Sequence, residues 1–260
     1  MLSTAASYSL ITKNLTRTTE TTAKRADVAR EVDYYLKNIE KVKSIDDFMK
    51  DARLYRFAMK AHGLEDMAYA KAFMRKILTE GVESKTSFAN KLTDIRYREF
   101  ATTFNFATFG DTATLFADAK QGTVDKYLRQ TIETDAGAKN EGVRLALYIQ
   151  RKAPQLTSAY SILADKALLT VVQTTLGFSP MTALADIDKQ AQMISAKLDV
   201  ADLKDPEKLK KFLNRFATMW DMQNGQTAGA SPAAPISGKA SLGISANVLA
   251  SLQGLKLGGR

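Results

Sequence analysis

Apolar residues recur at helical spacing along most of this 260-residue chain, and part of the pattern occurs twice. The stretch from Ser44 to Leu54 aligns with the stretch from Ser158 to Leu168, and at the same offset Gly63 aligns with Gly177. The matched positions are those that build a helix: a capping serine, an apolar stripe and a terminating glycine. Such a repeat indicates stacked supersecondary units that bury a shared core.

Residues typical of helix N-caps and C-terminal ends predict a series of helices and no strand. A Ser-Pro pair at 179–180 and an Asp-Pro pair at 205–206 suit helix starts, because proline at the first helical position has no N–H to satisfy. Gly137 and Gly142 are expected to interrupt the helical pattern. The sequence therefore predicts an all-α fold. The expected helices cover residues 27–41, 44–62, 65–78, 87–104, 111–122, 123–132, 143–149, 158–176, 180–198 and 205–220.

Composition and the repeat divide the chain into five expected parts. Residues 1–27 form a polar, extended N-terminal arm that we expect to order against a partner. Residues 28–110 and 154–222 form two pseudo-repeated helical units, joined by connecting helices over residues 111–153. Residues 223–260 form a low-complexity tail rich in Gly, Ala and Ser, where a short amphipathic helix near residues 244–252 would need a partner.

Composition excludes several classes of site. The chain has no cysteine, so it has no disulfide framework, thiolate metal site or cysteine nucleophile. A net charge of +9 permits contact with nucleic acid or an anionic membrane, but the cationic residues are interleaved with acidic ones, so no nucleic-acid partner is expected. No stretch approaches the roughly 20 apolar residues of a membrane helix. The Ser, Thr, Lys and Arg bias of residues 1–25 leaves an organellar transit peptide as an alternative.

The candidate chemical residues favour structural roles. His62 is the single histidine, and its position near a helix end favours a partly buried residue whose protonated form suits the helix dipole. The clustered carboxylates of Asp46, Asp47 and Asp51 suggest magnesium as one interpretation, but acidic residues in a first helical turn explain them more simply. Phosphate-loop, nucleophile-elbow, HExxH and EF-hand patterns are not found. We therefore expect no catalytic, cofactor-binding or metal-binding residue, and no enzymatic activity.

Two cationic patches and a methionine series also have structural interpretations. We expect the patches to be solubilising helix faces rather than phosphate clamps. We expect the methionines to pack in the core, with an adaptable binding groove as the alternative. The patches are Lys71, Arg75 and Lys76, and Lys208, Lys210 and Lys211; the methionines are Met49, Met59, Met67 and Met74.

Several stretches resemble one bacterial family. They run from Ser7 to Thr12, Val28 to Tyr35, Lys41 to Phe48, Tyr55 to Leu64, Ser87 to Leu92 and Asn140 to Tyr148. The family is a domain family of unknown function found in alphaproteobacterial flagellar gene clusters, with members sometimes described as rod-like proteins of the flagellar basal body. The resemblance spans about residues 1–222 and excludes the tail. The chain lacks the Asn-rich N-terminal motif and strong terminal heptads typical of rod and hook subunits.

The resemblance implies a structural or assembly role in the flagellum. A chain without cysteine or a cleaved signal, with terminal segments that order on assembly, suits a protein exported by the flagellar secretion apparatus. Such a protein would act through helix–helix contacts with other flagellar proteins or with further copies of itself, in the flagellum or the extracellular space. A cytosolic export chaperone or regulator of flagellar synthesis is the alternative.

Overall fold

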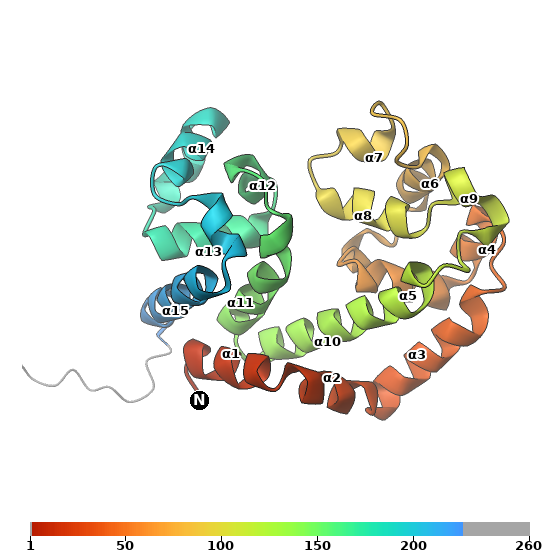
Figure 1. The fold of residues 1–260 in the computed structure, drawn as a ribbon, viewed down its shortest axis with the longest axis horizontal. Coiled ribbons are helices and arrows are strands. Elements are labelled where there is room, and N and C mark those ends of the chain that lie inside the picture. Colours follow the sequence, from red (N-terminus) through yellow and green to blue (C-terminus); the bar gives the residue numbers. More distant parts are fainter. Residues whose placement is uncertain (1, 226–260) are drawn as a thin grey trace, which may run out of the picture. The chain divides into compact units, whose positions relative to one another are not determined.

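The computed structural model describes residues 2–225, and these form helices and connecting turns with no strand among them (Figure 1). The prediction of an all-α fold is confirmed. The expected helix near residues 244–252 lies outside the described residues, as does nearly all of the expected tail. No helix within residues 2–225 is long and apolar enough to cross a membrane.

The first of two hydrophobic clusters lies in the N-terminal half of the described chain. Aromatic rings form its centre: the Phe48 and Phe104 ring centroids are 4.8 Å apart, and those of Phe100 and Phe104 are 5.0 Å apart. Its buried aliphatic residues include Ile39 and Ile77. The elements that build it are α3 (Ala26–Ile39), α4 (Ile45–Lys50), α5 (Ala52–Ala61), η1 (Glu65–Met67), α6 (Lys71–Glu80), α7 (Phe88–Lys91), α8 (Ile95–Thr103), α9 (Phe106–Phe109), η2 (Gly110–Thr112) and η3 (Asp118–Gly122).

The second cluster lies in the C-terminal half and is largely aliphatic. Leu147, Val171 and Val172 are fully buried there, and Phe216 supplies its main buried aromatic ring. The elements around it are α11 (Glu141–Lys152), η4 (Ala153–Gln155), α12 (Ala159–Leu163), α13 (Lys166–Leu176), η5 (Pro180–Leu184), α14 (Ile187–Ser195), η6 (Val200–Lys204) and α15 (Pro206–Gln223).

Helix α10 (Thr123–Lys139) belongs to both clusters. Val124 and Leu128 pack in the first, and Ile132 and Ala136 pack in the second. These residues follow one another at four-residue spacing and so share one face of the helix. The two clusters are therefore joined by an unbroken helix; the boundaries expected for the two units stay a prediction.

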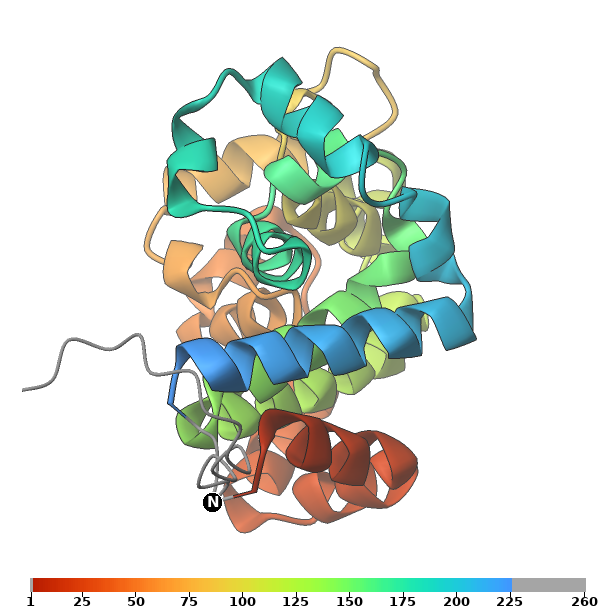
Figure 2. The same cartoon turned by 90° about the vertical axis from the view of Figure 1, so that its left-hand side faces the viewer.

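The N-terminal segment differs from the expected extended arm. It forms α1 (Thr4–Lys13) and α2 (Leu15–Ala23), and α1 packs against α11 and α15 (Figures 1 and 2). Tyr8 is buried in the second hydrophobic cluster and Ile11 packs against it, so the apolar stripe of this polar segment is covered by the chain itself.

A buried polar contact fixes the start of α1. The backbone N–H of Thr4 donates to Asp221 Oδ2 at 3.0 Å, and the Thr4 hydroxyl donates to Asp221 Oδ1. Asn140 Nδ2 donates to the Thr4 hydroxyl at 2.9 Å, which ties α1 to the start of α11 as well. Both ends of the described chain therefore meet through charge-assisted hydrogen bonds.

Aspartate caps divide several helices that we expected to be continuous. Asp51 ends α4 and caps α5, because its carboxylate accepts from the N–H groups of Arg53 and Leu54 at 3.1 and 3.0 Å. Asp94 separates α7 from α8, and Asp165 separates α12 from α13, in the same way. The helices predicted over residues 44–62, 87–104 and 158–176 are corrected accordingly.

The expected interruptions at Gly137 and Gly142 are also wrong, because both glycines lie inside helices. The break comes between them, at Asn140, whose side chain caps α11 by accepting from the Gly142 N–H at 2.9 Å. A Cβ at position 142 would lie 2.4 Å from Trp220 Cδ1, so this glycine permits close packing of α11 and α15.

The two segments aligned by the sequence repeat share a local arrangement. The Tyr34 hydroxyl donates to Asp51 Oδ2 at 2.8 Å, and the Tyr148 hydroxyl donates to Asp165 Oδ2 at 2.5 Å. The two pairs are related by the offset that aligns the repeat. In both segments, a tyrosine on one helix holds the aspartate that caps another.

Candidate functional site

A polar cleft of about 660 Å³ lies between elements of the two halves. Its walls carry Asp66, Asp94, Arg96, Glu141, Arg144, Tyr148, Asp165, Lys166 and Trp220, among others. All four carboxylates of the cleft, those of Asp66, Asp94, Glu141 and Asp165, lie at cap or first-turn positions of helices.

Ion pairs and hydrogen bonds fix several side chains that line the cleft. The Arg96 guanidinium lies 2.7 Å from Asp94 Oδ2 and also donates to the Gly63 carbonyl oxygen. Burial, together with the charge and hydrogen bond of Asp165, raises the pKa of Tyr148. Tyr148 is therefore a neutral hydrogen-bond donor near pH 7, and the cleft offers charged and hydrogen-bonding groups without an ionised tyrosine.

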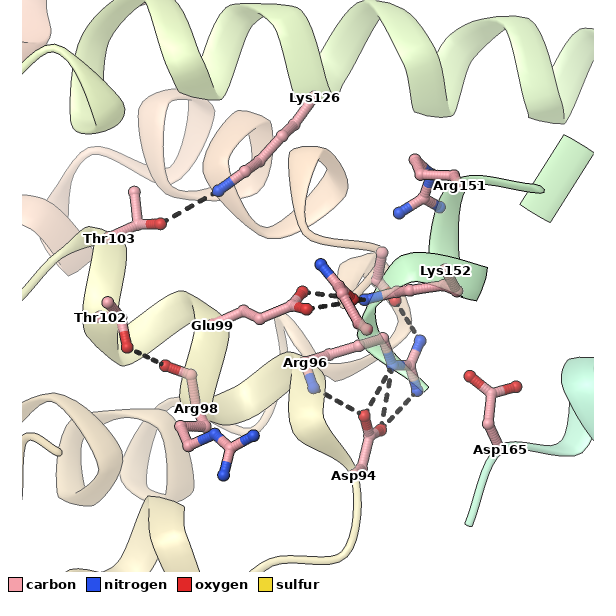
Figure 3. A network of polar contacts seen from close by, with 12 residues as sticks. Asp94, Arg96, Arg98, Glu99, Thr102, Thr103, Lys126, Arg151, Lys152 and Asp165 are labelled. Carbon is pink, nitrogen blue, oxygen red and sulfur yellow. Dashed lines mark hydrogen bonds and ion pairs between the residues drawn. The ribbon is translucent and has the colours of Figure 1, made fainter. Parts of the chain in front are cut away.

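A basic cluster lies beside the cleft, between α8, α10 and α11 (Figure 3). It consists of Lys126, Arg129, Arg151 and Lys152. Lys152 Nζ lies 2.9 Å from Glu99 Oε2 on α8, which links the two halves. The guanidinium group of Arg151 donates to both oxygens of Glu133 on α10, at 2.8 and 2.9 Å.

Glu133 joins two arginines of this cluster. Its side chain is 2% exposed, and Arg129 Nε donates to Oε1 at 3.3 Å, the oxygen that Arg151 Nε also contacts. Lys126 Nζ donates to the Thr103 hydroxyl at 3.1 Å (Figure 3). The sequence does not predict the basic cluster, because most of its acidic partners are distant in sequence. Only the four-residue spacing of Arg129 and Glu133 indicates an ion pair on one helix.

His62 is a buried core residue at the C-cap of α5. Its ring lies 5.3 Å from that of Phe100, and neither ring nitrogen has a hydrogen-bond partner within residues 2–225. Burial, reinforced by the positive charges of Lys126, Lys152 and Arg151, lowers its pKa well below the usual value. The expected burial is observed, and the lowered pKa keeps the imidazole neutral at neutral pH.

The acidic cluster on α4 serves the backbone and the surface. Asp47 accepts from the Ser44 hydroxyl at 2.8 Å, and Asp46 pairs with Arg75 at 2.6 Å. Asp51 caps α5. Among the residues that the structure describes, no group of three or more acidic or histidine side chains is placed to hold a metal ion.

The lysines of the two cationic patches noted in the sequence make different contacts in the structure. Lys71 Nζ donates to the Met49 carbonyl oxygen at 3.0 Å, while Lys76 lies near Glu80. Lys208 pairs with Asp202 at 2.6 Å, whereas Lys210 and Lys211 are exposed. The methionines at positions 49, 59 and 74 are buried in the first hydrophobic cluster, and Met67 packs against it.

Three exposed large apolar side chains, which we call the exposed apolar patch, follow one another in sequence at η5 and the start of α14. It consists of Met181, Leu184 and Ile187, whose exposed fractions are 68%, 78% and 56%. Residues three apart in a 3₁₀-helix share a face, so Met181 and Leu184 point the same way. Grouped large apolar side chains at this exposure are typical of interaction surfaces.

Comparison with known proteins gives a family and a related structure. The model of the family described as "Protein of unknown function (DUF1217)" matches residues 61–209. A crystal structure of a protein from Agrobacterium tumefaciens is 52% identical, with a TM-score of 0.79, over 86% of this chain and 97% of that chain. No curated protein matches the sequence. The chain therefore belongs to the DUF1217 family, whose function is unknown.

Proposed function

We propose that this protein is a non-enzymatic component of the bacterial flagellum, structural or in assembly, that is exported and acts through helix–helix contacts. The flagellar part of the proposal is supported by the sequence stretches quoted above, such as the one from Tyr55 to Leu64. The contact part is carried by the exposed apolar patch of Met181, Leu184 and Ile187.

The size of the patch suits a contact made during assembly. Full burial of a large apolar side chain contributes about 1.5–3 kcal/mol. Three partly exposed side chains can therefore stabilise a contact substantially but fall short of the area of an obligate interface. Repetition of the contact along an assembly would add to its stability.

A cytosolic export chaperone or regulator of flagellar synthesis is the second candidate. It is favoured by Met181 in the patch and by Met193 nearby on α14, because flexible methionine side chains adapt to different partners. This candidate predicts an intracellular pool bound to another flagellar component.

Complementation of a deletion strain tests the role of the patch. We expect the double variant Met181→Lys, Leu184→Lys to accumulate normally but to give fewer flagella and reduced swimming. Tyr69→Lys is the matched control, because Tyr69 is 81% exposed and lies outside the patch. Full flagellation with the double variant would contradict the proposed contact, and full motility of the deletion strain itself would contradict the flagellar role.

A further inference from the structure

A second surface, at the edge of α1, has a different chemistry from the apolar patch. It is a groove of about 440 Å³ between α1, the end of α11, η6 and α15. Its accessible apolar lining consists of Pro154 and Pro206, which are exposed, and Leu209, which is half-buried; Tyr8 and Leu203 lie buried beneath them. An apolar base between packed helices is the kind of surface that receives the apolar face of another helix.

The rim of the groove is basic. Lys13, Lys204 and Lys210 line it from three different elements, and each is exposed. None of the three makes an ion pair within residues 2–225. Glu207 is the one carboxylate among the lining residues, so the groove carries an excess of positive charge.

We propose that this groove binds an acidic amphipathic helix of a partner protein. The apolar face of that helix would cover Pro154, Pro206 and Leu209, and its carboxylates would lie opposite the three lysines. The apolar base favours a helix over a nucleic acid, since nucleic-acid sites present mainly phosphate contacts and stacking faces.

The C-terminal segment of this chain does not have the composition of the proposed acidic helix. Residues 226–260 contain two lysines and one arginine but no aspartate or glutamate. That segment therefore lacks the negative charge that complements Lys13, Lys204 and Lys210. Electrostatic complementarity of this kind sets partner choice and association rate, and it weakens as salt is added.

Polar side chains beside the lysines extend the surface that a helix can contact. Thr12 on α1 and Asn214 on α15 both line the groove. Along α15, Lys210 and Asn214 are four residues apart and share a helix face with Pro206. The groove therefore runs along α15 and offers a stripe of contacts, as a bound helix requires.

A pair of synthetic peptides tests this assignment on the full chain. The first is a fluorescein-labelled amphipathic helix of about five turns, with leucine on one face and glutamate on the other. In the second, lysine replaces every glutamate. Fluorescence anisotropy measures the affinity of each at low and physiological salt.

Charge-reversal variants locate the binding. The double variant Lys204→Glu, Lys210→Glu is expected to bind the acidic peptide about tenfold more weakly than the natural chain and the lysine peptide more tightly. Lys189→Glu with Lys211→Glu changes the net charge equally at exposed positions outside the groove, and should leave both affinities close to those of the natural chain. Circular dichroism confirms that both double variants are folded.

Three results would overturn the proposal. Equal weakening by the groove and control variants would show a net-charge effect. A single-stranded oligonucleotide of matched charge that binds as tightly, with the same dependence on Lys204 and Lys210, would assign the surface to nucleic acid. Self-association of the full chain that is abolished by the groove variant would assign it to a second copy.

Discussion

At the scale of single residues, His62 shows how burial sets a charge state. The imidazole lies against Phe100 and Phe104, and its nearest charges are cationic. Both effects disfavour the imidazolium, so the folded chain takes up this proton well below pH 6.5. The unfolded chain takes it up near 6.5, so the stability linked to His62 is complete above that pH and declines below it.

His62→Leu should remove this dependence. We predict that the stability of the natural chain falls between about pH 6.5 and pH 5 more steeply than that of the variant. At pH 7.5 the variant should be no less stable, because an apolar side chain leaves no unpaired ring nitrogen. Urea unfolding across this pH range measures the difference, and parallel stability profiles for the two proteins would contradict the argument.

Two helical glycines offer a matched comparison. A Cβ at Gly142 would lie 2.4 Å from the rigid indole of Trp220, whereas a Cβ at Gly137 would meet the flexible side chain of Arg144 at 2.8 Å. We predict that Gly142→Ala lowers the free energy of unfolding by about 1–3 kcal/mol despite its better helix propensity. Gly137→Ala should be neutral or stabilising by up to about 1 kcal/mol. Thermal unfolding compares them, and equal effects would refute the packing role of Gly142.

At the scale of elements, local sequence predicted helix content well and helix ends unevenly. Ser44 and Asp205 were recognised as caps because each precedes a clear apolar run. Asp51 and Asp165 were missed because they lie within runs whose apolar spacing continues across them. A residue that caps one helix and ends another is set by a distant contact, here the hydroxyl groups of Tyr34 and Tyr148.

Helix α1 is held by the bond between Thr4 and Asp221, which suggests a direct test. Asp221→Ala removes the acceptor for both Thr4 donors, which are buried. We expect a loss of about 1–3 kcal/mol and faster trypsin cleavage at Lys13 and Arg17. Asp188→Ala on α14 is the control, since it removes an exposed carboxylate from another helix. Equal cleavage rates in the two variants would show that Asp221 does not hold α1.

Asp221→Ala should also affect binding at the groove. Tyr8, Thr12 and Lys13 line the groove and lie on α1, so loosening this helix should lower the affinity of the chain for the acidic peptide. The groove was not predictable from sequence, because it is formed by α1 and α15 from opposite ends of the described chain. Local patterns describe each helix but do not indicate which helices pack together.

At the scale of the whole molecule, α10 and the basic cluster couple the two halves. Glu133 lies between two arginines, and its side chain is almost fully buried. Glu133→Gln should therefore lower the free energy of unfolding by about 1–3 kcal/mol, because it leaves two partly buried guanidinium groups, 15% and 27% exposed, without their carboxylate. Glu141→Gln, at the exposed pair with Arg144, should cost at most about 1 kcal/mol. Chemical denaturation distinguishes these results, and similar losses would contradict the structural role of the Glu133 ion pairs within α10 and between α10 and α11.

The proposed role through contacts rests on two surfaces of the described chain. The apolar patch lies on η5 and α14, whereas the basic groove lies along α1 and α15, so the two surfaces are built by different elements. Two surfaces of different chemistry would allow contacts with two different partners. The all-α architecture was readable from helical spacing, whereas both surfaces depend on exposure and packing that only the structure provides.

The flagellar role is tested most directly by locating the protein. Immunoblots of cells, culture supernatant and sheared flagella would be compared between a wild-type strain and a mutant that lacks flagellar export. We predict that the protein is present in the sheared fraction of the wild type and lost from it in the mutant. Protein confined to the cytoplasm in both strains would contradict an exported flagellar component and favour the chaperone or regulator.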